Sequence, residues 1–547
     1  MEKIKNKFIE NKLFIIVAVC IIITIFMPYT QWELVIGDDY EYHIARIQSI
    51  AEEFKLGNFP VKIHSQMANS YGYGSGLFYS NLFLYFPAML TFFGMHVASA
   101  YKIFVFVMLC AMFGLSYYSL KIITGDSKSA LIGTIIIMLS RNFIFNIYHR
   151  FAVGEYLGFM FILPIIAGMY DYIHEDFKKP WLLVLGFWGV INSHVITTVI
   201  CIIFCLIYFL INIKSTIKNW KKFGKLVWCA IIVALLTASF WIPAIEQHLS
   251  QSFRYSDSWA VIGNTEYTLV DLLGNRKTAV GYMILILIPI YLYVLLNEKT
   301  KKSTKLFIIT MFTLMLFVLW HCFWKTTNDI TTFIQFKWRL VGLITIFAGI
   351  SLAMISKDYK DVLEKYIDIL IIILLAISMF FVTEFTNFEN RANIKKSYED
   401  LSKEMYLSPL SIGGGGEYLP INLKYEKLYN PMQVFGDKGS IINISKNGLS
   451  ATFDKEVSDT IFCVPYVYYY GYVAHLEKEN GEIIPLEVGK TEDGLLEIKV
   501  NENDFGKVNL WYNGTKIQKI SYIITAFSYL GVVVIGIRQI LICKKRK

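Results

Sequence analysis

The chain has 547 residues, of which 55% are hydrophobic and only 17% are charged, and its mean hydropathy is +0.48. A soluble protein carries about a quarter of its residues as charged side chains, so this composition argues against a soluble protein. The net charge of +9 comes largely from lysines in short loops and at the two ends. That distribution is typical of cytoplasmic loops in membrane proteins, and it gives no reason to expect nucleic acid as a partner.

Twelve apolar segments have about the length needed to cross a hydrocarbon core of roughly 30 Å. They lie near residues 13–29, 99–121, 128–147, 152–172, 181–192, 194–213, 225–245, 280–296, 305–324, 338–355, 363–383 and 519–542. Lysine-rich stretches occur at 1–12, 214–225, 299–305, 357–365 and the C-terminal K-K-R-K. With a cytoplasmic N-terminus, twelve spans place all five stretches on the inner side. The region 181–213 is the weakest part of this count, because it is long for one helix and short for two.

The predicted orientation divides the chain into four parts. Residues 1–383 form a transmembrane module whose first outer loop is 30–98, and 384–439 form an outer linker with a glycine-rich loop. Residues 440–518 contain short β-type runs separated by N-G and D-G turns, which predict a small antiparallel β-sandwich. The last part, 519–547, is a span followed by a basic cytoplasmic tail. We expect a multi-pass plasma-membrane protein with both termini in the cytoplasm.

The stretch G-D-D-Y-E-Y-H-I-A-R-I, residues 37–47, follows the first predicted span. If Asp39 begins a helix, then Asp39, His43 and Arg46 lie on one stripe, and Asp38 begins the neighbouring stripe. An acid at a helix start is also an ordinary N-cap. Capping explains one aspartate, but it does not explain two acids, a histidine and an arginine at a membrane boundary. We therefore interpret the stretch as the acidic part of an outer site.

A second charged stretch is R-N-F-I-F-N-I-Y-H-R-F-A-V-G-E, from Arg141 to Glu155. It also carries His149 and Arg150. Arginines in an outer loop run against the positive-inside trend, and a lipid phosphate would give them a role because guanidinium binds phosphate with two hydrogen bonds. Glu155 would lie about one turn inside a span, where an ionisable group is a functional candidate. The alternative is an internal arginine–glutamate pair that holds two helices together.

Two further stretches place polar groups on the same predicted outer face. I-Q-F-K-W-R-L, residues 334–340, supplies Lys337 and Arg339, which could bind phosphate or simply extend to the interface. Asn192-Ser193-His194 separates two apolar segments, and His194 could contact phosphate or cap a helix.

Glycines and tyrosines mark two outer segments. In G-G-G-G-E-Y-L-P, residues 413–420, Glu417 and Tyr418 follow a very free backbone, which is either a flexible linker or a loop that closes over a site. Y-G-Y-G-S-G-L-F-Y-S, residues 71–80, could line a carbohydrate groove or belong to an interfacial aromatic belt.

With these stretches, the chain resembles the GT-C superfamily of integral-membrane glycosyltransferases. It is more closely similar to a bacterial membrane family labelled 6-pyruvoyl-tetrahydropterin-synthase-related, although no residue here supports a pterin activity. The resemblance extends from residue 38 to 420 and includes D-D-Y-E-Y-H-I-A-R-I, G-N-F-P, Y-G-Y-G, Y-H-R-F-A-V-G-E-Y-L, S-H-V-I-T-T, I-Q-F-K-W-R-L and G-E-Y-L-P. Lys337 departs from it, since proline is expected before the tryptophan.

The resemblance implies a sugar donor linked to polyprenyl phosphate, undecaprenyl phosphate in a bacterium. Asp39, or else Asp38, would deprotonate an acceptor hydroxyl, which would attack the anomeric carbon with inversion. The acceptor would be a cell-surface glycan, a teichoic-acid-like polymer or a lipid. A separate cytoplasmic-side glycosyltransferase and a flippase would supply the donor.

The cationic part of the implied site has two versions. In one, Arg150, Lys337, Arg339, His149 and Arg141 bind the donor phosphate, supported by His43, Arg46, Glu155, His194, Glu417 and Tyr418. In the other, Asp38, Asp39 and His43 also hold Mg²⁺ or Mn²⁺. The rival functions are a transporter or flippase of lipid-linked glycans and a non-catalytic envelope-assembly factor.

Overall fold

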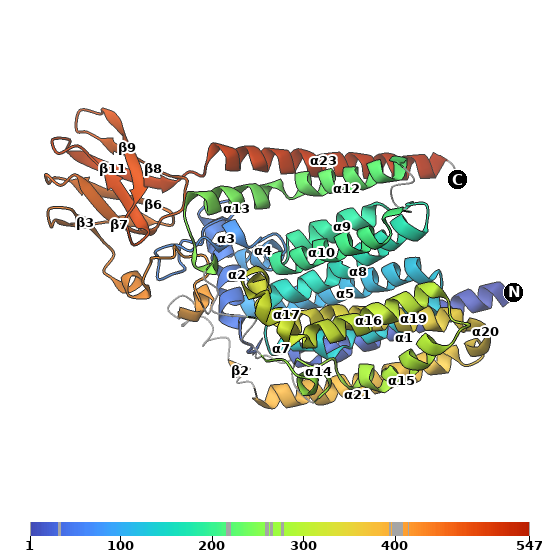
Figure 1. Ribbon diagram of the computed structural model, residues 1–547. Helices are drawn as coiled ribbons and strands as arrows, with labels where there is room; N and C mark the ends of the chain where they lie inside the picture. Colours follow the sequence, from blue (N-terminus) through green and yellow to red (C-terminus); the bar gives the residue numbers. More distant parts are fainter. Residues whose placement is uncertain are drawn as a thin grey trace. The chain divides into compact units, whose positions relative to one another are not determined.

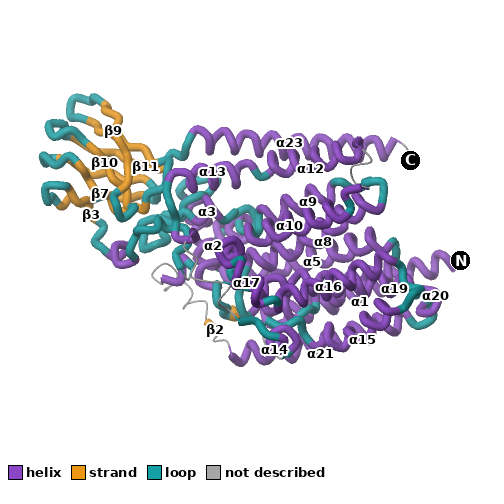
Figure 2. The backbone as a smooth tube through the Cα atoms, viewed as in Figure 1, coloured by secondary structure: helices purple, strands orange, loops and turns teal. Residues whose placement is uncertain are grey.

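The computed structural model describes residues 2–30, 34–214, 220–256, 262, 266–274, 278–392, 395–396, 409–413 and 415–545. Parts of the predicted linker 384–439, of the basic loop 214–225 and of the predicted outer loop 246–279 lie outside these residues. The chain forms two compact units. The first comprises residues 1–40, 101–230 and 258–401, and the second comprises 41–100, 231–257 and 402–547. Figures 1 and 2 show that most of the chain is helical and that strands gather in one C-terminal domain.

The first unit is a helical bundle. Its helices are α1 (Glu2–Phe26), α5 (Val97–Thr124), α6 (Ser127–Met138), α7 (Arg141–Tyr148), α8 (Val153–His174), α9 (Trp181–Ile191), α10 (Val195–Ile211), α14 (Leu269–Leu273), α15 (Tyr282–Leu296), α16 (Lys302–Leu319), α17 (His321–Thr326), α18 (Asn328–Thr331), α19 (Val341–Asp358), α20 (Lys360–Leu363) and α21 (Ile367–Ala392). Helices α8 and α19 are buried along nearly their whole length and form its centre. Strands β1 (Leu34–Val35) and β2 (Lys395–Lys396) pair antiparallel.

The second unit combines helices with the strand domain. Its helices are α2 (Tyr40–Lys55), α3 (Ser75–Phe78), α4 (Tyr85–Phe92), α13 (Ala238–Ser250) and α23 (Lys516–Lys545), and α12 (Trp220–Leu236) runs from the first unit into the second. Helices α13 and α23 pack against each other.

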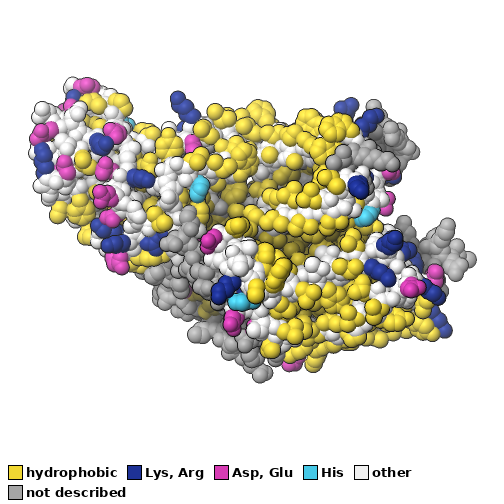
Figure 3. Space-filling model, viewed as in Figure 1, with side chains coloured by type: hydrophobic (Ala, Val, Ile, Leu, Met, Phe, Trp, Pro, Cys, Tyr) yellow, Lys and Arg dark blue, Asp and Glu magenta, His cyan; other side chains and the backbone are white. Residues whose placement is uncertain are grey.

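Seven helices of the described residues are long and apolar enough to cross a membrane. The number is nine if each of two bent helix pairs, α6–α7 at 45° and α12–α13 at 71°, is one span. All twelve predicted segments contain helix, but α9, α10 and α15 have only 11, 17 and 15 residues. On the face drawn in Figure 3, hydrophobic side chains cover the helices. These features indicate a membrane protein, while the count of twelve spans stays a prediction.

The strand domain is one curled antiparallel sheet. Its strands are β3 (Gln433–Gly436), β4 (Ile441–Asn443), β5 (Ser445–Asn447), β6 (Ser450–Lys455), β7 (Ile461–Val467), β8 (Tyr472–Glu477), β9 (Ile483–Lys490), β10 (Leu495–Lys499) and β11 (Gly506–Tyr512). They pair in the order β4-β3-β7-β10-β9-β8-β11-β6-β5. The edge strands β4 and β5 are separated by one residue in the chain, so the sheet is nearly closed.

The sheet encloses its own apolar core. Residues at alternate positions, such as Val508 and Leu510 on β11, are buried, and Val508 pairs with the buried Phe453 on β6. The prediction of a small antiparallel β domain is confirmed. The prediction of a sandwich is wrong in detail, because β9 pairs with both β10 and β8 and joins the two halves into one sheet.

Candidate functional site

The two aspartates of the opening stretch lie on a turn held by a distant segment. The Asp38 N–H donates to the carbonyl oxygen of His149, and the Asp39 N–H donates to that of Arg150, both at 2.9 Å. A Cβ on Gly37 would lie 2.7 Å from the His149 carbonyl oxygen, so only glycine fits this approach. The turn therefore brings Asp38 and Asp39 beside residues more than a hundred positions away in the chain.

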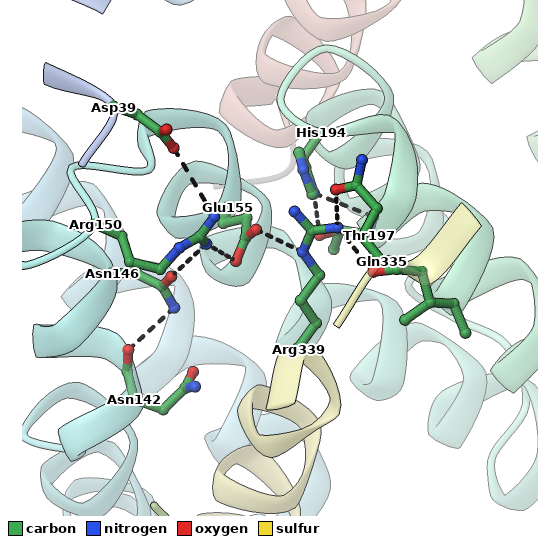
Figure 4. Close-up of polar contacts among 10 residues, drawn as sticks. Asp39, Asn142, Asn146, Arg150, Glu155, His194, Thr197, Gln335 and Arg339 are labelled. Carbon is green, nitrogen blue, oxygen red and sulfur yellow. Dashed lines mark hydrogen bonds and ion pairs between the residues drawn. The ribbon is translucent and has the colours of Figure 1, made fainter. Parts of the chain in front are cut away.

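Glu155 joins two arginines in an ion-pair cluster, which we call the arginine cluster (Arg150, Glu155 and Arg339). Its Oε2 lies 2.6 Å from Nη1 of Arg150, and its Oε1 lies 2.8 Å from Nε of Arg339. The three side chains are 11%, 10% and 8% exposed. Asp39 is 42% exposed and lies 3.9 Å from Nη2 of Arg150, as Figure 4 shows. The cluster thus consists of two cations around one buried carboxylate, with a more exposed aspartate at its edge.

Helix α7 and the bend after it orient Arg150. Asn146 Oδ1 accepts a hydrogen bond from Arg150 Nη1 at 3.1 Å, and Asn146 itself donates to the carbonyl oxygen of Asn142. The guanidinium lies over the Trp338 ring at 4.6 Å, a favourable cation–π distance. Phe151, at φ 53°, bends the chain between α7 and α8. Burial lowers the pKa of Arg150, but the carboxylates of Glu155 and Asp39 raise it, and the net pKa lies above the ordinary value.

Arg339 is fixed from the opposite side by the 3₁₀ turn Lys337–Leu340 and the residues before it. Its Nη1 donates to the carbonyl oxygen of Ile334 at 2.8 Å and to Oε1 of Gln335 at 2.6 Å. Gln335 has φ 64°, a conformation that costs a non-glycine residue free energy. The backbone is therefore strained at Gln335, whose side chain accepts a hydrogen bond from Arg339.

A pocket opens beside the arginine cluster within the first unit. Polar side chains on its lining are Asn142, Asn146, Glu155, Thr197 and Arg339. The rest of the lining is Phe159, Ile162, Ile200, Gly342 and Leu343. A ligand in this pocket would meet one cation, Arg339, together with Glu155 and apolar side chains.

Several predicted residues lie at this site. The structure brings together Asp39, Arg150, Glu155 and Arg339, and it places Asp38 and His149 on the paired backbone beside them.

Among the other predicted residues of the first unit, His194 lies beside Arg339, as Figure 4 shows. His194 caps α10 by accepting the Thr197 N–H at 3.3 Å, Arg141 begins α7, and Lys337 is buried in the same turn as Arg339.

The predicted stripe of Asp39, His43 and Arg46 assumes a helix that begins at Asp39, and in the structure α2 begins at Tyr40, with Asp39 in the turn directly before it. His43 and Arg46 belong to the second unit and are buried there. Arg46 donates to Asn81 Oδ1 at 2.7 Å and lies over the Tyr79 ring at 4.4 Å. Its guanidinium is therefore occupied by neutral groups of its own unit.

Glu417 and Tyr418 also belong to the second unit. The structure holds both residues through their backbones, and the choice between a flexible linker and a loop that closes over a site stays a prediction. The Tyr255 N–H donates to the Glu417 carbonyl oxygen at 2.8 Å, and the Tyr418 N–H donates to Tyr73 Oη at 3.3 Å. Gly414 lies outside the described residues.

Sequence reasoning missed Asn142, Asn146, Gln335 and Thr197. The spacing of 142, 146 and 150 was a usable signal, because polar residues four apart in an apolar helix share one face. For metals, the described part of the chain holds no group of three or more His, Cys, Asp or Glu side chains arranged to bind an ion. The divalent cation thus stays a prediction that rests on the resemblance.

Comparison with known proteins adds one relative. No family model matches the chain. An uncharacterized protein of Lactococcus lactis subsp. cremoris (strain MG1363) is 24% identical over 595 aligned positions, which cover 97% of this chain and 96% of the relative. The similarity therefore extends over both units and the strand domain.

Proposed function

We propose that this protein is an extracytoplasmic glycosyltransferase of the GT-C type. It transfers a sugar from a polyprenyl-phosphate donor to a cell-surface glycan, a teichoic-acid-like polymer or a lipid. The observation that carries the proposal is the position of Asp39, a partly exposed carboxylate 3.9 Å from Arg150 at the edge of a two-arginine cluster. A base beside paired cations suits a reaction that removes a proton and expels a phosphate.

Asp39 is the proposed base. It takes the proton of an acceptor hydroxyl while the oxygen attacks the anomeric carbon of the donor sugar. The bond from that carbon to the phosphate oxygen breaks, and polyprenyl phosphate leaves with the bonding electron pair. Attack from the face opposite the leaving group inverts the configuration.

The arginine cluster supplies the charge for the leaving group. Two guanidinium groups and Glu155 leave one positive charge, which the carboxylate of Asp39 balances in the resting site. When Asp39 takes the proton, that positive charge is no longer balanced. It then stabilises the phosphate that forms at the same moment, because guanidinium pairs well with phosphate oxygens.

The pocket supports a lipid-linked donor. Phe159, Ile162 and Leu343 offer an apolar surface next to Arg339 and Glu155. A phosphate attached to a hydrocarbon chain matches this combination, since the phosphate would meet Arg339 and the first carbons of the chain would contact apolar side chains. A water-soluble nucleotide sugar would leave the apolar wall unused.

The base assignment is tested by Asp39→Asn and Asp38→Asn, assayed for sugar incorporation in membranes at equal expression. We expect Asp39→Asn to lower the rate of sugar transfer about 10²- to 10⁴-fold, which is the usual contribution of a general base. Asp38→Asn tests the alternative base, because Asp38 is on the same turn and exposed, and a loss in this variant alone would assign the proton transfer to Asp38. Full transfer by both variants would show that the base is elsewhere.

The donor role is tested by Arg150→Lys, which keeps the charge but loses the two-pronged geometry. The KM for donor should rise more than the KM for acceptor, and an unchanged donor KM would sink the phosphate role. In liposomes, movement of a labelled lipid-linked sugar without transfer would identify a flippase instead.

A further inference from the structure

The second unit contains an aromatic surface built from three distant segments. Tyr79, Tyr255 and Tyr418 are partly exposed, and we call them the tyrosine platform. Phe78, which precedes Tyr79, is buried beside the other two: its ring stacks on Tyr418 at 5.5 Å with an interplanar angle of 6°, and it lies 5.5 Å from Tyr255. The ring centroids of Tyr255 and Tyr418 lie 6.3 Å apart, and the two rings are tilted by 52°. Phe78 therefore supports two tyrosine rings that remain partly exposed.

The backbone under the platform is held rigidly. The Tyr418 carbonyl oxygen accepts a hydrogen bond from Tyr469 Oη at 3.0 Å, and its N–H donates to Tyr73 Oη at 3.3 Å. A Cβ on Gly74 would lie 2.5 Å from the Tyr469 ring, so glycine is needed for this packing. A surface fixed in this way loses little conformational entropy when a ligand binds.

Arg46 fixes Tyr79 without offering a charge to a ligand. The guanidinium is 1% exposed, and Nη2 donates to Asn81 Oδ1 and to the carbonyl oxygens of Tyr79 and Ser80. These neutral acceptors engage Nη2, while Nε is buried and donates to no described residue. Arg46 therefore acts as a support for the Tyr79 ring.

Glu417 precedes Tyr418 in the chain and lies beside the platform. Among the described residues, its carboxylate forms no ion pair. A Cβ on Gly413 would lie 2.6 Å from Glu417 Oε2, so Gly413 packs closely against the acid. Burial raises the pKa of Glu417, and the backbone N–H groups of Glu417 and Gly415 only partly offset that rise.

The geometry points to a binding site for a neutral sugar unit, in which the tyrosine platform stacks on the sugar and Glu417 accepts its hydroxyl hydrogens. Aromatic rings present flat apolar faces that match the C–H face of a pyranose, and tyrosine adds a polar group at its edge. An ionised carboxylate accepts hydrogen bonds from several hydroxyls. Among the described residues beside the platform, Arg46 is buried, and Arg254 is held by the Leu423 carbonyl oxygen and the Tyr425 ring, so phosphate or a uronic acid is disfavoured. The further assignment of this sugar to the acceptor glycan rests on the proposed function.

The site is tested by measuring the binding of sugars to the purified full-length protein in detergent with isothermal titration calorimetry. The probes are an uncharged N-acetylhexosamine disaccharide, a neutral hexose disaccharide and inorganic phosphate. We expect at least one neutral disaccharide to bind and phosphate not to bind. Binding of neither disaccharide, or of phosphate alone, would overturn the proposal.

Three variants and a control assign the binding to these residues. Tyr418→Leu should abolish sugar binding, whereas Tyr418→Phe should retain it within about threefold, because the ring remains. Glu417→Gln should weaken binding about tenfold or more, since it replaces a charged acceptor. Tyr429→Leu, an exposed tyrosine away from the platform, is the matched control and should bind normally. Unchanged binding in both Tyr418→Leu and Glu417→Gln would overturn the proposal.

The glycosyltransferase proposal and the sugar-site proposal can be disproved independently of each other. Asp39→Asn should bind the disaccharide as the wild type does and yet transfer no sugar. Sugar binding with no transfer by the wild type would end the glycosyltransferase proposal and leave the site standing. If Glu417→Gln leaves the acceptor KM of sugar transfer unchanged and the wild type binds no disaccharide, the sugar site is excluded. The glycosyltransferase proposal would then still stand.

Discussion

The tetrapeptide Gly-Glu-Tyr-Leu occurs twice in this chain, at 154–157 and 416–419, with different results. In the first unit it lies in the first turn of α8, where Glu155 binds two arginines. In the second unit Pro420 follows it, the segment is not helical, and Glu417 forms no ion pair with a described residue. Proline disfavours a helical residue before it, which explains the difference in backbone.

The comparison shows that one local sequence supports two kinds of recognition. A carboxylate between guanidinium groups organises positive charge and suits a phosphate. A carboxylate among tyrosines, without a cation, suits hydroxyl groups. Variants of the two glutamates, of Gly37 and of Lys62 test whether the two units differ in this way.

The largest expected effect is the loss of stability in Glu155→Gln. Removing the shared carboxylate leaves two buried guanidinium groups without their counter-ion, which should cost about 3–5 kcal/mol of unfolding free energy. Glu417→Gln is the matched control in the second tetrapeptide, and it should change stability by less than about 1 kcal/mol. Thermal unfolding in detergent measures both, and equal losses would remove the distinction between the two sites.

Gly37→Ala tests whether the backbone pairing places Asp39 at the arginine cluster. The new methyl group would collide with the His149 carbonyl oxygen, and overpacking of this kind costs about 1–3 kcal/mol. Sugar transfer should fall together with stability, because the turn carrying Asp39 shifts. Gly114→Ala on α5 is the control, since nothing lies within 4 Å of its Cβ. Wild-type transfer in Gly37→Ala would show that this turn does not position the base.

The arginines of the first unit pair with a carboxylate, whereas Lys62 of the second unit donates to a carbonyl oxygen, and Lys62→Met tests what that contact contributes to stability. Pro243 has no N–H for the carbonyl oxygen of Ser239, four residues earlier in α13, and Lys62 Nζ donates to that oxygen at 2.7 Å. Lys62→Met should lower the free energy of unfolding by about 1 kcal/mol. Lys55→Met, which removes an exposed ion pair with Glu52, should lose less. An equal or smaller loss in Lys62→Met would mean that the carbonyl is satisfied otherwise.

The smallest effect is a pH dependence at Glu417. Its folded-state pKa is raised by burial, so the folded protein binds more protons than the unfolded chain between the ordinary glutamate pKa and the raised one. Stability contributed by this group is therefore present below that window and falls as pH rises through it. The difference in melting temperature between wild type and Glu417→Gln, followed from about pH 4 to pH 8, should shrink or reverse with rising pH. A difference that stays constant would contradict the raised pKa.

Local patterns predicted much of the fold. Apolar segments of the right length became helices, and period-two runs with N-G and D-G turns became an antiparallel β domain. Arg150, Glu155 and Arg339 were also identified from the sequence, because charge is costly and rare among apolar spans. The curled single sheet was not predicted, since the pairing of β9 with both β8 and β10 depends on long-range register.

The sequence by itself determined which segments are apolar, where helices and strands form, and which charged residues interrupt them, because these follow from short-range periodicity. Only the tertiary structure decided which charges meet. Backbone hydrogen bonds from Asp38 and Asp39 to residues 149 and 150 bring the base to Arg150, while His43 and Arg46, on the expected stripe, are buried elsewhere. The two Gly-Glu-Tyr-Leu segments differ for the same physical reason: contacts between distant segments determine whether a buried carboxylate faces guanidinium groups or tyrosines.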